Sequence, residues 1–497
     1  MKKSRGHSMP LLLEPRALSG QPLYRRLYRR IREGVLNGAI APGTRLPSAR
    51  TLAREEGISR NTVESALQQL RAEGFLVRRV GSGTYVRSDI RPALLRPLEA
   101  SVAAVSGAPR SGSLRRLSRR GEQAGATSSS DTETPAGLSF SPCLPGLEAI
   151  PLDSWKRIAA RQVRRGPASL LAPPPAGLPA LREAVAGYAN MNRGVRCTPE
   201  QVVVLNSTQQ AIDLTARLLL DPGDDVWFED PGYVSARNAL LAAGARLIAV
   251  PVDDGGFDVA RAASLAPSAR LAYVTPSHQY PLGVTLSLTR RLELLEWAAR
   301  SGAWVLEDDY DSELRYEGRP LASLQGMDGS GRVIYAGTFN KILFPTLRLA
   351  YLVLPPELVE PFARAKELAD GSASPLQQAT LAEFISEGHF SIHLRKVREL
   401  YRERRDRLLS VASDVLPSDV RLGPADSGMH VALHLPDDAD DRRIAALARQ
   451  HGLATPALSS YCIERQMSGL LVHYGNAVPS EIESGIRKLA DLLRKRR

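Results

Sequence analysis

The chain has 497 residues, 43% of them hydrophobic, which is enough for several domains that each bury a core. Its formal charge of +12 is concentrated near the N-terminus, because residues 1–130 hold 24 Lys and Arg against 9 Asp and Glu. The remainder is nearly neutral, and it contains no run of about 18 apolar residues, which excludes a membrane-spanning helix. A basic segment joined to a near-neutral globular body indicates a nucleic-acid partner.

Cysteine usage and the N-terminal residues bear on location. The three cysteines, Cys143, Cys197 and Cys462, show no metal-ligand spacing, and their odd number fits a reduced compartment. The N-terminus lacks the apolar core of a signal peptide. We therefore expect a cytoplasmic protein that is not exported and does not enter a membrane.

Residues 20–87 are predicted to form three helices and a hairpin. Apolar residues recur every four positions over 23–35, which predicts an amphipathic helix. Two more helices follow, with Ser48 and Ser59 as candidate N-caps, because a serine hydroxyl can accept from a free backbone N–H group. A short glycine-containing turn between these helices is typical of a helix-turn-helix, and two β-rich runs over 75–86 predict a hairpin wing.

Composition divides the rest of the chain. Residues 1–19 are predicted to be a disordered N-terminus, and residues 88–137, rich in Ser, Gly, Ala, Pro and Arg, a flexible linker of roughly fifty residues. The linker arginines either contact DNA phosphates or only keep the linker extended. Residues 138–497 alternate helices with short apolar strands, which predicts a doubly wound α/β domain with a mostly parallel sheet. Its large part is expected at about 170–355 and a smaller α+β part at about 356–497.

The N-terminal motifs are specific enough to indicate a family. Pro-Gly-Thr-Arg-Leu-Pro-Ser-Ala-Arg at 42–50 precedes Ser-Arg-Asn-Thr-Val at 59–63, and Leu-Arg-Ala-Glu-Gly-Phe follows at 70–75. Together these runs resemble the winged helix-turn-helix of GntR-type regulators over about residues 20–87. This resemblance implies that double-stranded DNA is contacted by Arg50, Ser59, Arg60, Asn61, Thr62 and Gly81.

The chemistry of these side chains agrees with DNA binding. The first turn of a recognition helix reaches base edges, an arginine can bind guanine through two hydrogen bonds, and short hydroxyl and amide side chains hold phosphates. Two alternatives remain open. Ser59 could serve only as a helix cap, and Arg50 could only pair with Glu55 or Glu56.

One lysine in the C-terminal part has the surroundings of a cofactor-binding residue. Lys341 lies among small and apolar residues in the run 335–348, with Thr338 before it and Arg348 after it. An amine must lose its proton to attack an aldehyde, and apolar surroundings lower its pKa. A hydroxyl and a guanidinium can hold a phosphate. The run therefore predicts a Schiff base between Lys341 and pyridoxal 5'-phosphate (PLP), whereas the lysine taken alone would be read as a surface residue.

Five further motifs support this interpretation. They are Pro-Ala-Gly-Leu-Pro-Ala-Leu-Arg at 175–182, Asn-Ser-Thr-Gln-Gln-Ala at 206–211, Glu-Asp-Pro-Gly-Tyr at 229–233, Thr-Pro-Ser-His-Gln-Tyr-Pro-Leu-Gly at 275–283 and Glu-Asp-Asp-Tyr-Asp-Ser-Glu at 307–313. With the lysine run, they resemble the fold-type I aminotransferases. The two parts, joined in one chain, resemble the MocR subfamily of GntR regulators over nearly the whole sequence.

The resemblance implies a PLP site made of nine residues: Ser207, Thr208, Gln209, Tyr233, Asp308, Tyr310, Thr338, Lys341 and Arg348. The first three lie between a predicted strand and helix, where free N–H groups and the helix dipole accept a phosphate. Asp308 is expected to pair with the pyridinium nitrogen. Tyr310 is expected to donate to the cofactor's phenolate oxygen, and Tyr233 to stack on its ring.

Several of these assignments have alternatives. Spacing alone does not choose among Asp308, Asp309 and Asp311. Both tyrosines could instead be ordinary core aromatics. His278 and Gln279 either line the pocket or serve a structural role.

Departures from the family pattern bear on activity. Where related sequences carry Tyr-x-Asp-Pro-x-Gly, this chain has Ala-Pro-Pro-Pro-Ala-Gly at 172–177, so a phosphate contact from the neighbouring subunit is expected to be lost. Asn340 and Ile342 replace the Ser and Thr that are common beside the lysine. The arginine that grips a substrate carboxylate should fall within 469–474, yet none occurs there, and Arg465 is out of register. Without that clamp an amino acid is poorly oriented for proton transfer.

These observations favour a dimeric, PLP-bound transcriptional regulator. Its effector is expected to be an amine, an amino acid or PLP itself, and its dimer is expected to bind paired DNA half-sites. The competing hypothesis is a working aminotransferase with a DNA-binding appendage. A third, an architectural DNA binder with an empty lysine site, is disfavoured by the intact set of Asp308, Lys341 and Arg348.

Overall fold

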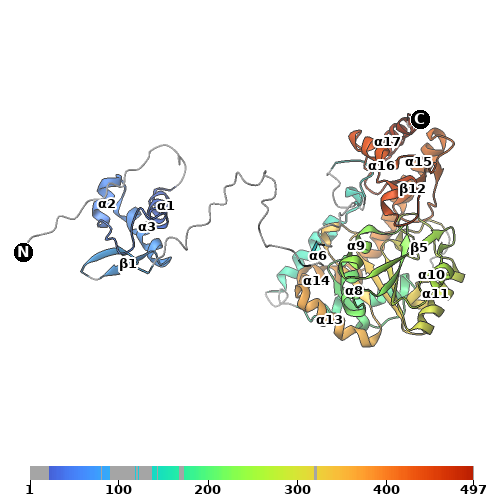
Figure 1. Ribbon diagram of the computed structural model, residues 1–497, viewed down its shortest axis with the longest axis horizontal. Helices are drawn as coiled ribbons and strands as arrows, with labels where there is room; N and C mark the ends of the chain where they lie inside the picture. The colour runs from blue at the N-terminus through green and yellow to red at the C-terminus, as the bar shows by residue number, and fades with distance from the viewer. Residues whose placement is uncertain are drawn as a thin grey trace, which may run out of the picture. The chain divides into compact units, whose positions relative to one another are not determined.

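The computed structural model describes two units of the chain. The described residues are 22–79, 81–89, 118, 121–122, 137–142, 144–166, 173–317 and 322–495. The boundary between the units falls between Arg115 and Arg116, within the predicted linker 88–137. Most of that linker and the predicted N-terminal segment 1–19 lie outside the described residues. Figure 1 shows the first unit in blue and the second in colours from teal to red.

The first unit folds into three helices and a two-stranded hairpin. Its elements are α1 (Leu23–Leu36), α2 (Ala49–Glu56), α3 (Arg60–Ala72), β1 (Leu76–Arg79) and β2 (Gly83–Val86). Apolar side chains spaced by helical turns meet in one core, which includes Leu27, Ile31, Val35, Leu52, Val63, Leu67 and Leu70. The predicted winged helix-turn-helix is therefore confirmed.

Local chemistry sets the turns of this unit. The Ser48 hydroxyl caps α2 by accepting the N–H of Thr51 at 3.1 Å, and Ser59 caps α3 by accepting the N–H of Thr62 at 3.1 Å. Between the helices Gly57 has a φ of 65°, which ends α2 in the left-handed conformation that glycine tolerates. The caps and the glycine fix the angle at which α3 leaves α2.

An ion pair joins α1 to the end of α2. Arg30 contacts Glu56, whose side chain is only 3% exposed. Glu56 is therefore engaged by α1, and the alternative pairing of Arg50 with Glu55 or Glu56 does not occur. Within the described residues Arg50 and Glu55 are exposed and neither forms an ion pair. Arg50 remains available at the first turn of α2.

The second unit is built on an eight-stranded sheet in the order β3-β10-β9-β8-β7-β4-β5-β6. Its strands are β3 (Val202–Leu205), β4 (Asp225–Asp230), β5 (Arg246–Asp253), β6 (Gly256–Phe257), β7 (Leu271–Val274), β8 (Trp304–Asp309), β9 (Val333–Thr338) and β10 (Ala350–Val353). The five central strands from β9 to β5 run parallel to one another. β10 pairs antiparallel with β9 and β3, and β6 pairs antiparallel with β5. The prediction of a mostly parallel sheet is confirmed.

Helices cover both faces of this sheet (Figure 1). They are α6 (Leu152–Arg164), α7 (Pro179–Asn192), α8 (Thr208–Leu219), α9 (Val234–Ala242), α10 (Val259–Leu265), α11 (Leu288–Ser301), α12 (Leu324–Met327), α13 (Pro356–Asp370) and α14 (Pro375–Ser386). Adjacent residues of one strand enter different cores. Phe228 packs with the residues of α8 and α9, whereas Trp227 packs with those of α10 and α11. Burial on both faces explains the apolar runs at residues 226–228 of β4 and 271–274 of β7.

The smaller part combines a short sheet with three helices, drawn in orange and red in Figure 1. Its elements are α15 (His389–Val415), β11 (Arg421–Leu422), β12 (His430–His434), α16 (Asp441–Gln450), β13 (Gly469–His473) and α17 (Pro479–Arg494). The strands are antiparallel, with β12 in the centre, and α17 packs along α15. Helices α13 and α14 pack instead on α8, α6 and α7 of the larger part.

The segment that follows the predicted linker is attached to this smaller part. Ser139 exchanges backbone hydrogen bonds with Gly452 and Ala454, at 3.1 and 2.8 Å. Phe140 is fully buried against Gly485, where a Cβ atom would come within 2.6 Å of the phenyl ring. The absence of a side chain at Gly485 therefore leaves room for Phe140.

Candidate functional site

A cavity lies at the carboxyl ends of the parallel strands. It is lined by Thr208 at the start of α8, Tyr233 after β4, Asp308 in β8 and Lys341 after β9. The carboxyl ends of adjacent parallel strands meet at one edge, which is where open α/β sheets bind ligands. The other lining residues are Tyr273, Thr275, Tyr280, Tyr310, Asp311, Met429, His430 and His473.

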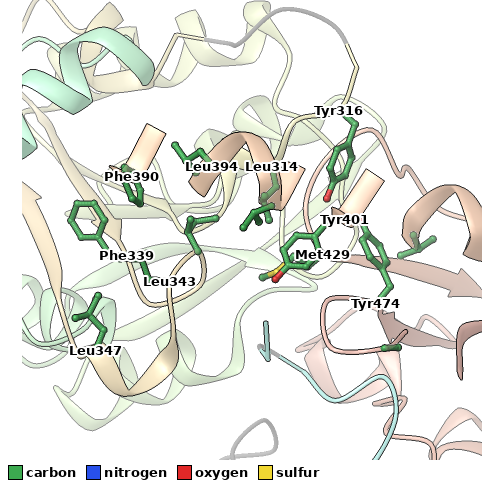
Figure 2. Close-up of a cluster of buried hydrophobic side chains, with 14 of the residues drawn as sticks. Leu314, Tyr316, Phe339, Leu343, Leu347, Phe390, Leu394, Tyr401, Met429 and Tyr474 are labelled. Atoms are coloured by element: carbon green, nitrogen blue, oxygen red, sulfur yellow. The ribbon is translucent and has the colours of Figure 1, made fainter. Parts of the chain in front are cut away.

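Apolar packing holds the turn that carries Lys341. Phe339, Leu343 and Leu347 are buried on either side of the lysine in the sequence. Figure 2 shows Phe339 beside Phe390, which comes from α15, and all four side chains belong to one buried cluster. The rings of Phe339 and Phe390 are 5.5 Å apart in an edge-to-face arrangement. The turn is thus anchored by its apolar residues, while Lys341 faces the cavity.

Asn340, one of the departures from the family pattern, closes this turn. Its N–H donates to the Thr338 hydroxyl at 3.2 Å, and its side-chain oxygen accepts the N–H of Leu349 at 3.1 Å. Thr338 is buried at the end of β9, and Arg348 is exposed with a left-handed φ of 54°. Neither Thr338 nor Arg348 belongs to the cavity lining, so their predicted contacts with a phosphate stay predictions.

The start of α8 presents the other predicted phosphate-binding residues. Ser207 caps the helix and accepts the N–H of Gln210 at 3.2 Å. Thr208 lines the cavity, whereas the Gln209 amide donates to the carbonyl oxygen of Ser235 at 3.0 Å. A helix N-terminus beside a cavity offers N–H groups and a positive dipole end to an anion. This end of α8 therefore fits a phosphate group.

Asp308 is the carboxylate placed to meet a cofactor nitrogen. Its Oδ2 accepts the hydroxyl hydrogen of Tyr273 at 2.7 Å, while its Oδ1 has no hydrogen-bond partner in the described part of the chain. Burial raises the pKa of Asp308 to about 6, and the hydrogen bond from Tyr273 opposes this rise. A buried acceptor atom without a donor at the cavity wall fits the protonated ring nitrogen of PLP.

The two neighbouring carboxylates are engaged elsewhere. Asp309 pairs with Arg193 at 2.5 Å and accepts the hydroxyl hydrogen of Tyr335 at 2.7 Å. Asp311 lies 3.0 Å from Nδ1 of His278, with both side chains buried. Asp308 and Asp311 line the cavity, whereas Asp309 does not. Because Asp311 already pairs with His278, Asp308 is favoured as the cofactor's partner.

Replacing Asp308 with Asn should flatten the pH dependence of stability in the cofactor-free protein. The folded-state pKa of about 6 exceeds the ordinary value of 3.8. Asp308 therefore stabilises the fold below about pH 4, and this contribution is lost as the pH rises through about 6. The difference of about two pKa units corresponds to about 3 kcal/mol.

Calorimetric melting of the wild type and Asp308→Asn between about pH 4 and pH 8 measures this effect. Burial also raises the pKa of Glu229 and of Glu307 to about 7 each. Both glutamates remain in the variant, so the difference between the two melting profiles isolates Asp308. Parallel profiles for the two proteins would contradict the assigned burial of an ionisable Asp308.

Two tyrosines predicted to contact the cofactor do line the cavity. The Tyr310 hydroxyl donates to the carbonyl oxygen of His278 at 2.9 Å, and Tyr233 packs edge-on against Tyr280 with ring centroids 5.8 Å apart. His278 and Gln279 are buried but are not part of the lining. The Gln279 amide donates to the carbonyl oxygen of Tyr280 at 2.8 Å. Neither side chain thus belongs to the described lining, and their functional role stays a prediction.

Sequence reasoning missed the wall that the smaller part contributes. His430 and His473 stand opposite each other in β12 and β13, with ring centroids 5.2 Å apart. Both are buried, and both line the cavity. Because side chains alternate along a strand, Leu471 shares the face of His473. β13, where the family pattern places an arginine, thus presents a leucine and a histidine on this face.

No arginine lines the cavity among the residues that the structure describes. Arg465 instead contacts the carbonyl oxygen of Val252. Its loop is held by Asp230, whose carboxylate accepts the N–H groups of Ile463, Glu464 and Arg465 at 2.8 to 2.9 Å. The described lining contains one cationic side chain, Lys341, and no group that could clamp a carboxylate through two hydrogen bonds.

The residues predicted to contact DNA lie in the first unit. Arg50 is in α2, residues 59–62 span the cap and first turn of α3, and Gly81 is in the hairpin turn. All are exposed except Thr62, which is half-buried. Their exposure leaves them accessible to a DNA duplex, and their contacts with DNA stay predictions.

Within the described ranges, no helix is both long and apolar enough to span a lipid bilayer. The same ranges contain no group of three or more His, Cys, Asp or Glu side chains placed to hold a metal ion.

Two known families match the two units of the chain. The family described as bacterial regulatory proteins, gntR family, matches residues 23–86. The family described as aminotransferase class I and II, which binds PLP, matches residues 143–469. The fold and the site thus define a DNA-binding helix-turn-helix domain joined to an aminotransferase-like domain.

The chain also matches transcriptional regulators of similar length along nearly all of its sequence. The chain is 39% identical over 470 residues to the probable rhizopine catabolism regulatory protein MocR of Rhizobium meliloti, covering 94% of this chain and 93% of that protein. It is 32% identical over 453 residues to the pyridoxine biosynthesis transcriptional regulator PdxR of Corynebacterium glutamicum, covering 91% of each. The chain belongs to the MocR subfamily of GntR-type transcriptional regulators.

Solved structures confirm the fold-type I architecture of the second unit. LysN, an α-aminoadipate aminotransferase from Thermus thermophilus, is 30% identical with a TM-score of 0.70, covering 76% of this chain and 97% of that one. That structure is complexed with N-(5'-phosphopyridoxyl)-L-leucine. Kynurenine aminotransferase from Pyrococcus horikoshii is 28% identical with a TM-score of 0.68, covering 73% of this chain and 92% of that one.

Proposed function

We propose that the protein binds PLP and that its aminotransferase-like domain senses a small molecule to control DNA binding. The observation that carries this proposal is a cavity whose groups suit PLP and whose described lining contains no arginine for a substrate carboxylate. Lys341 would hold the cofactor's aldehyde, Asp308 its ring nitrogen and the start of α8 its phosphate. When bound, PLP supplies an aldehyde that amines attack and a ring that withdraws electrons.

Two kinds of effector suit this site. An amine or amino acid can compete with Lys341 for the aldehyde, or PLP itself can be the signal by filling the cofactor-free cavity. The relatives include one regulator named for rhizopine catabolism and another named for pyridoxine biosynthesis. Both kinds of effector would stabilise one conformation of the aminotransferase-like domain over another.

Sustained transamination is the second candidate function. Lys341 and Asp308 line the cavity, and the chain is 32% identical to the 2-aminoadipate transaminase of Thermus thermophilus over 370 residues. We nevertheless expect turnover to be weak, because the carboxylate of an amino acid would lack a two-point partner in the described lining. A bound amino acid would then be poorly oriented for proton transfer.

The smaller part connects the cavity to the segment beyond the linker. It contributes His430 and His473 to the cavity wall, and it binds Ser139 and Phe140 on another surface. A shift of the smaller part on ligand binding would therefore displace the C-terminal end of the linker. We propose that this displacement changes the arrangement of the DNA-binding domains in a homodimer that reads paired half-sites.

The test measures DNA affinity and turnover in the same preparation. Duplexes selected from a random library with the full-length protein serve as the DNA probe. Fluorescence anisotropy would compare cofactor-free protein, PLP-loaded protein and PLP-loaded protein with added amines or amino acids. A second 2-oxo acid is added in every condition as the amino-group acceptor. A regulator should change its DNA affinity on PLP loading or amine addition, without accumulating the 2-oxo acid of the added amino acid. Continuous turnover with DNA affinity unchanged under every condition would favour the aminotransferase instead.

A further inference from the structure

We propose that His430 and His473 form a hydroxyl-binding subsite, so that the cavity selects an amine that carries a hydroxyl group instead of a carboxylate. This inference rests on the proposed function, because it requires an amine to approach Lys341. It goes further by naming the chemical class of the effector and the residues that select it.

The two histidines form a pair on one face of the small sheet. They stand directly opposite each other in β12 and β13, and their ring centroids are 5.2 Å apart. Both line the same cavity as Lys341. His473 is 4% exposed, and neither of its ring nitrogens has a hydrogen-bond partner among the described residues. Because buried polar atoms are usually hydrogen-bonded, this ring is a candidate to bind a ligand group.

The hydrogen bond of His430 determines what the pair can offer. Its Nε2 lies 3.1 Å from the carbonyl oxygen of Pro281, which can only accept. Nε2 must therefore carry the proton, and Nδ1 is left as an acceptor in the neutral ring. His473 can supply an N–H donor. A hydroxyl group matches this pair, because it can donate to His430 and accept from His473.

The same arrangement disfavours charged groups at this position. Burial lowers the pKa of His473 to about 3 and also lowers that of His430, so both rings are neutral near pH 7. A carboxylate can only accept and would face the lone pair of His430, and an ammonium group has no lone pair to accept from His473.

The remainder of this wall suits a hydrocarbon skeleton. Tyr280 packs against both histidines, with centroids 5.1 Å from His430 and 6.4 Å from His473. Met429 precedes His430 and also lines the cavity. An amine whose carbon frame contacts Tyr280 and Met429 would place its hydroxyl group at the nitrogen-bearing edges of the two rings.

Matched amines test the subsite in the PLP-loaded, full-length protein. The probes are cyclohexylamine, the 2-, 3- and 4-aminocyclohexanols and 2-aminocyclohexanecarboxylic acid. A change in the visible absorption spectrum of PLP, as the amine replaces Lys341, reports binding in each titration. At least one aminocyclohexanol should bind about tenfold more tightly than both cyclohexylamine and the amino acid, which is the usual contribution of one well-made buried hydrogen bond.

Three variants attribute this preference to residues. His473→Leu should bring the aminocyclohexanol to within about twofold of cyclohexylamine, because the donor is lost. His473→Gln keeps a donor and an acceptor and should retain part of the preference, which also covers the case in which the leucine variant fails to fold. His451 is exposed and outside the cavity, so His451→Leu should bind all probes as the wild type does.

The outcomes distinguish a failure of the hydroxyl subsite from a failure of amine sensing. Equal binding of all the amines, tighter binding of the amino acid or an unchanged preference in both His473 variants overturns the hydroxyl subsite. Those results leave amine sensing intact. If no amine displaces Lys341 from PLP, amine sensing and the hydroxyl subsite both fail, whereas a PLP-dependent change in DNA affinity would still support PLP as the effector.

Discussion

Replacing Lys341 with Ala should abolish covalent attachment of PLP and leave the fold intact. Lys341 is half-buried, and its turn is anchored by Phe339, Leu343 and Leu347, so truncation removes the amine without opening the core. After borohydride reduction, mass spectrometry should find PLP on the peptide that contains residue 341 in the wild type and on no such peptide in the variant. We also expect the PLP-dependent change in DNA affinity to be lost completely.

An exposed lysine of the same domain provides the control for this experiment. Lys396 lies on α15 and faces solvent, so Lys396→Ala should become labelled and should respond to PLP as the wild type does. Asp308 and the start of α8 remain in Lys341→Ala, so weak noncovalent binding of PLP is compatible with the assignment. A full DNA response in Lys341→Ala would show that attachment to this lysine is not part of the signal.

The fold could be predicted where one local pattern decides the structure. The apolar residues that recur every four positions over 23–35 predict α1, because their side chains contribute to the core of the first unit. The strands of the large sheet could also be predicted from the sequence, since a strand buried on both faces needs a run of apolar residues, as in Val202–Leu205. The short strands β12 and β13 were harder, because each depends on its partner for register and neither carries a clear alternation.

The part of the candidate site that the order of the parallel strands determines could be predicted from the sequence. Asp308 and Lys341 follow or end parallel strands, and such positions meet at one edge whatever the rest of the sequence does. The choice of Asp308 over Asp309 depends on Tyr273 and Arg193, which lie far away in the sequence. Spacing carries no record of these partners, so the local motif left the carboxylates equivalent.

Contacts between distant segments account for what the sequence did not reveal. His430 and His473 form a pair only because β12 and β13 align in one register. Arg30 reaches Glu56 from α1, which removes the partner proposed for Arg50. In both cases the role assigned to a side chain depends on which partners it or its neighbours already contact. Those contacts are known only from the folded chain. The consequence for DNA binding is that Arg50 and Arg60 are exposed without an ion pair among the described residues.

Arg60→Ala should weaken binding to a selected DNA site by about 5- to 150-fold, which corresponds to about 1–3 kcal/mol for a base contact. Arg60 is the first residue of α3, and the first turn of a recognition helix is the part that reaches base edges. Affinity for random duplexes should fall much less, because a base contact adds little to nonspecific binding. Adding Arg50→Ala should raise the total loss to at least about 25-fold, since each arginine contributes separately.

Arg71, in the last turn of the same helix, separates a local contact from a general loss of charge. It lies 3.9 Å from Glu64 and is about 16 Å along the helix axis from Arg60. Arg71→Ala removes the same charge as Arg60→Ala, so it should change affinity by no more than about twofold if position matters. Anisotropy titrations at several salt concentrations compare the variants. Equal losses for Arg60→Ala and Arg71→Ala would mean that α3 attracts DNA only through its net charge, and that its first turn does not read bases.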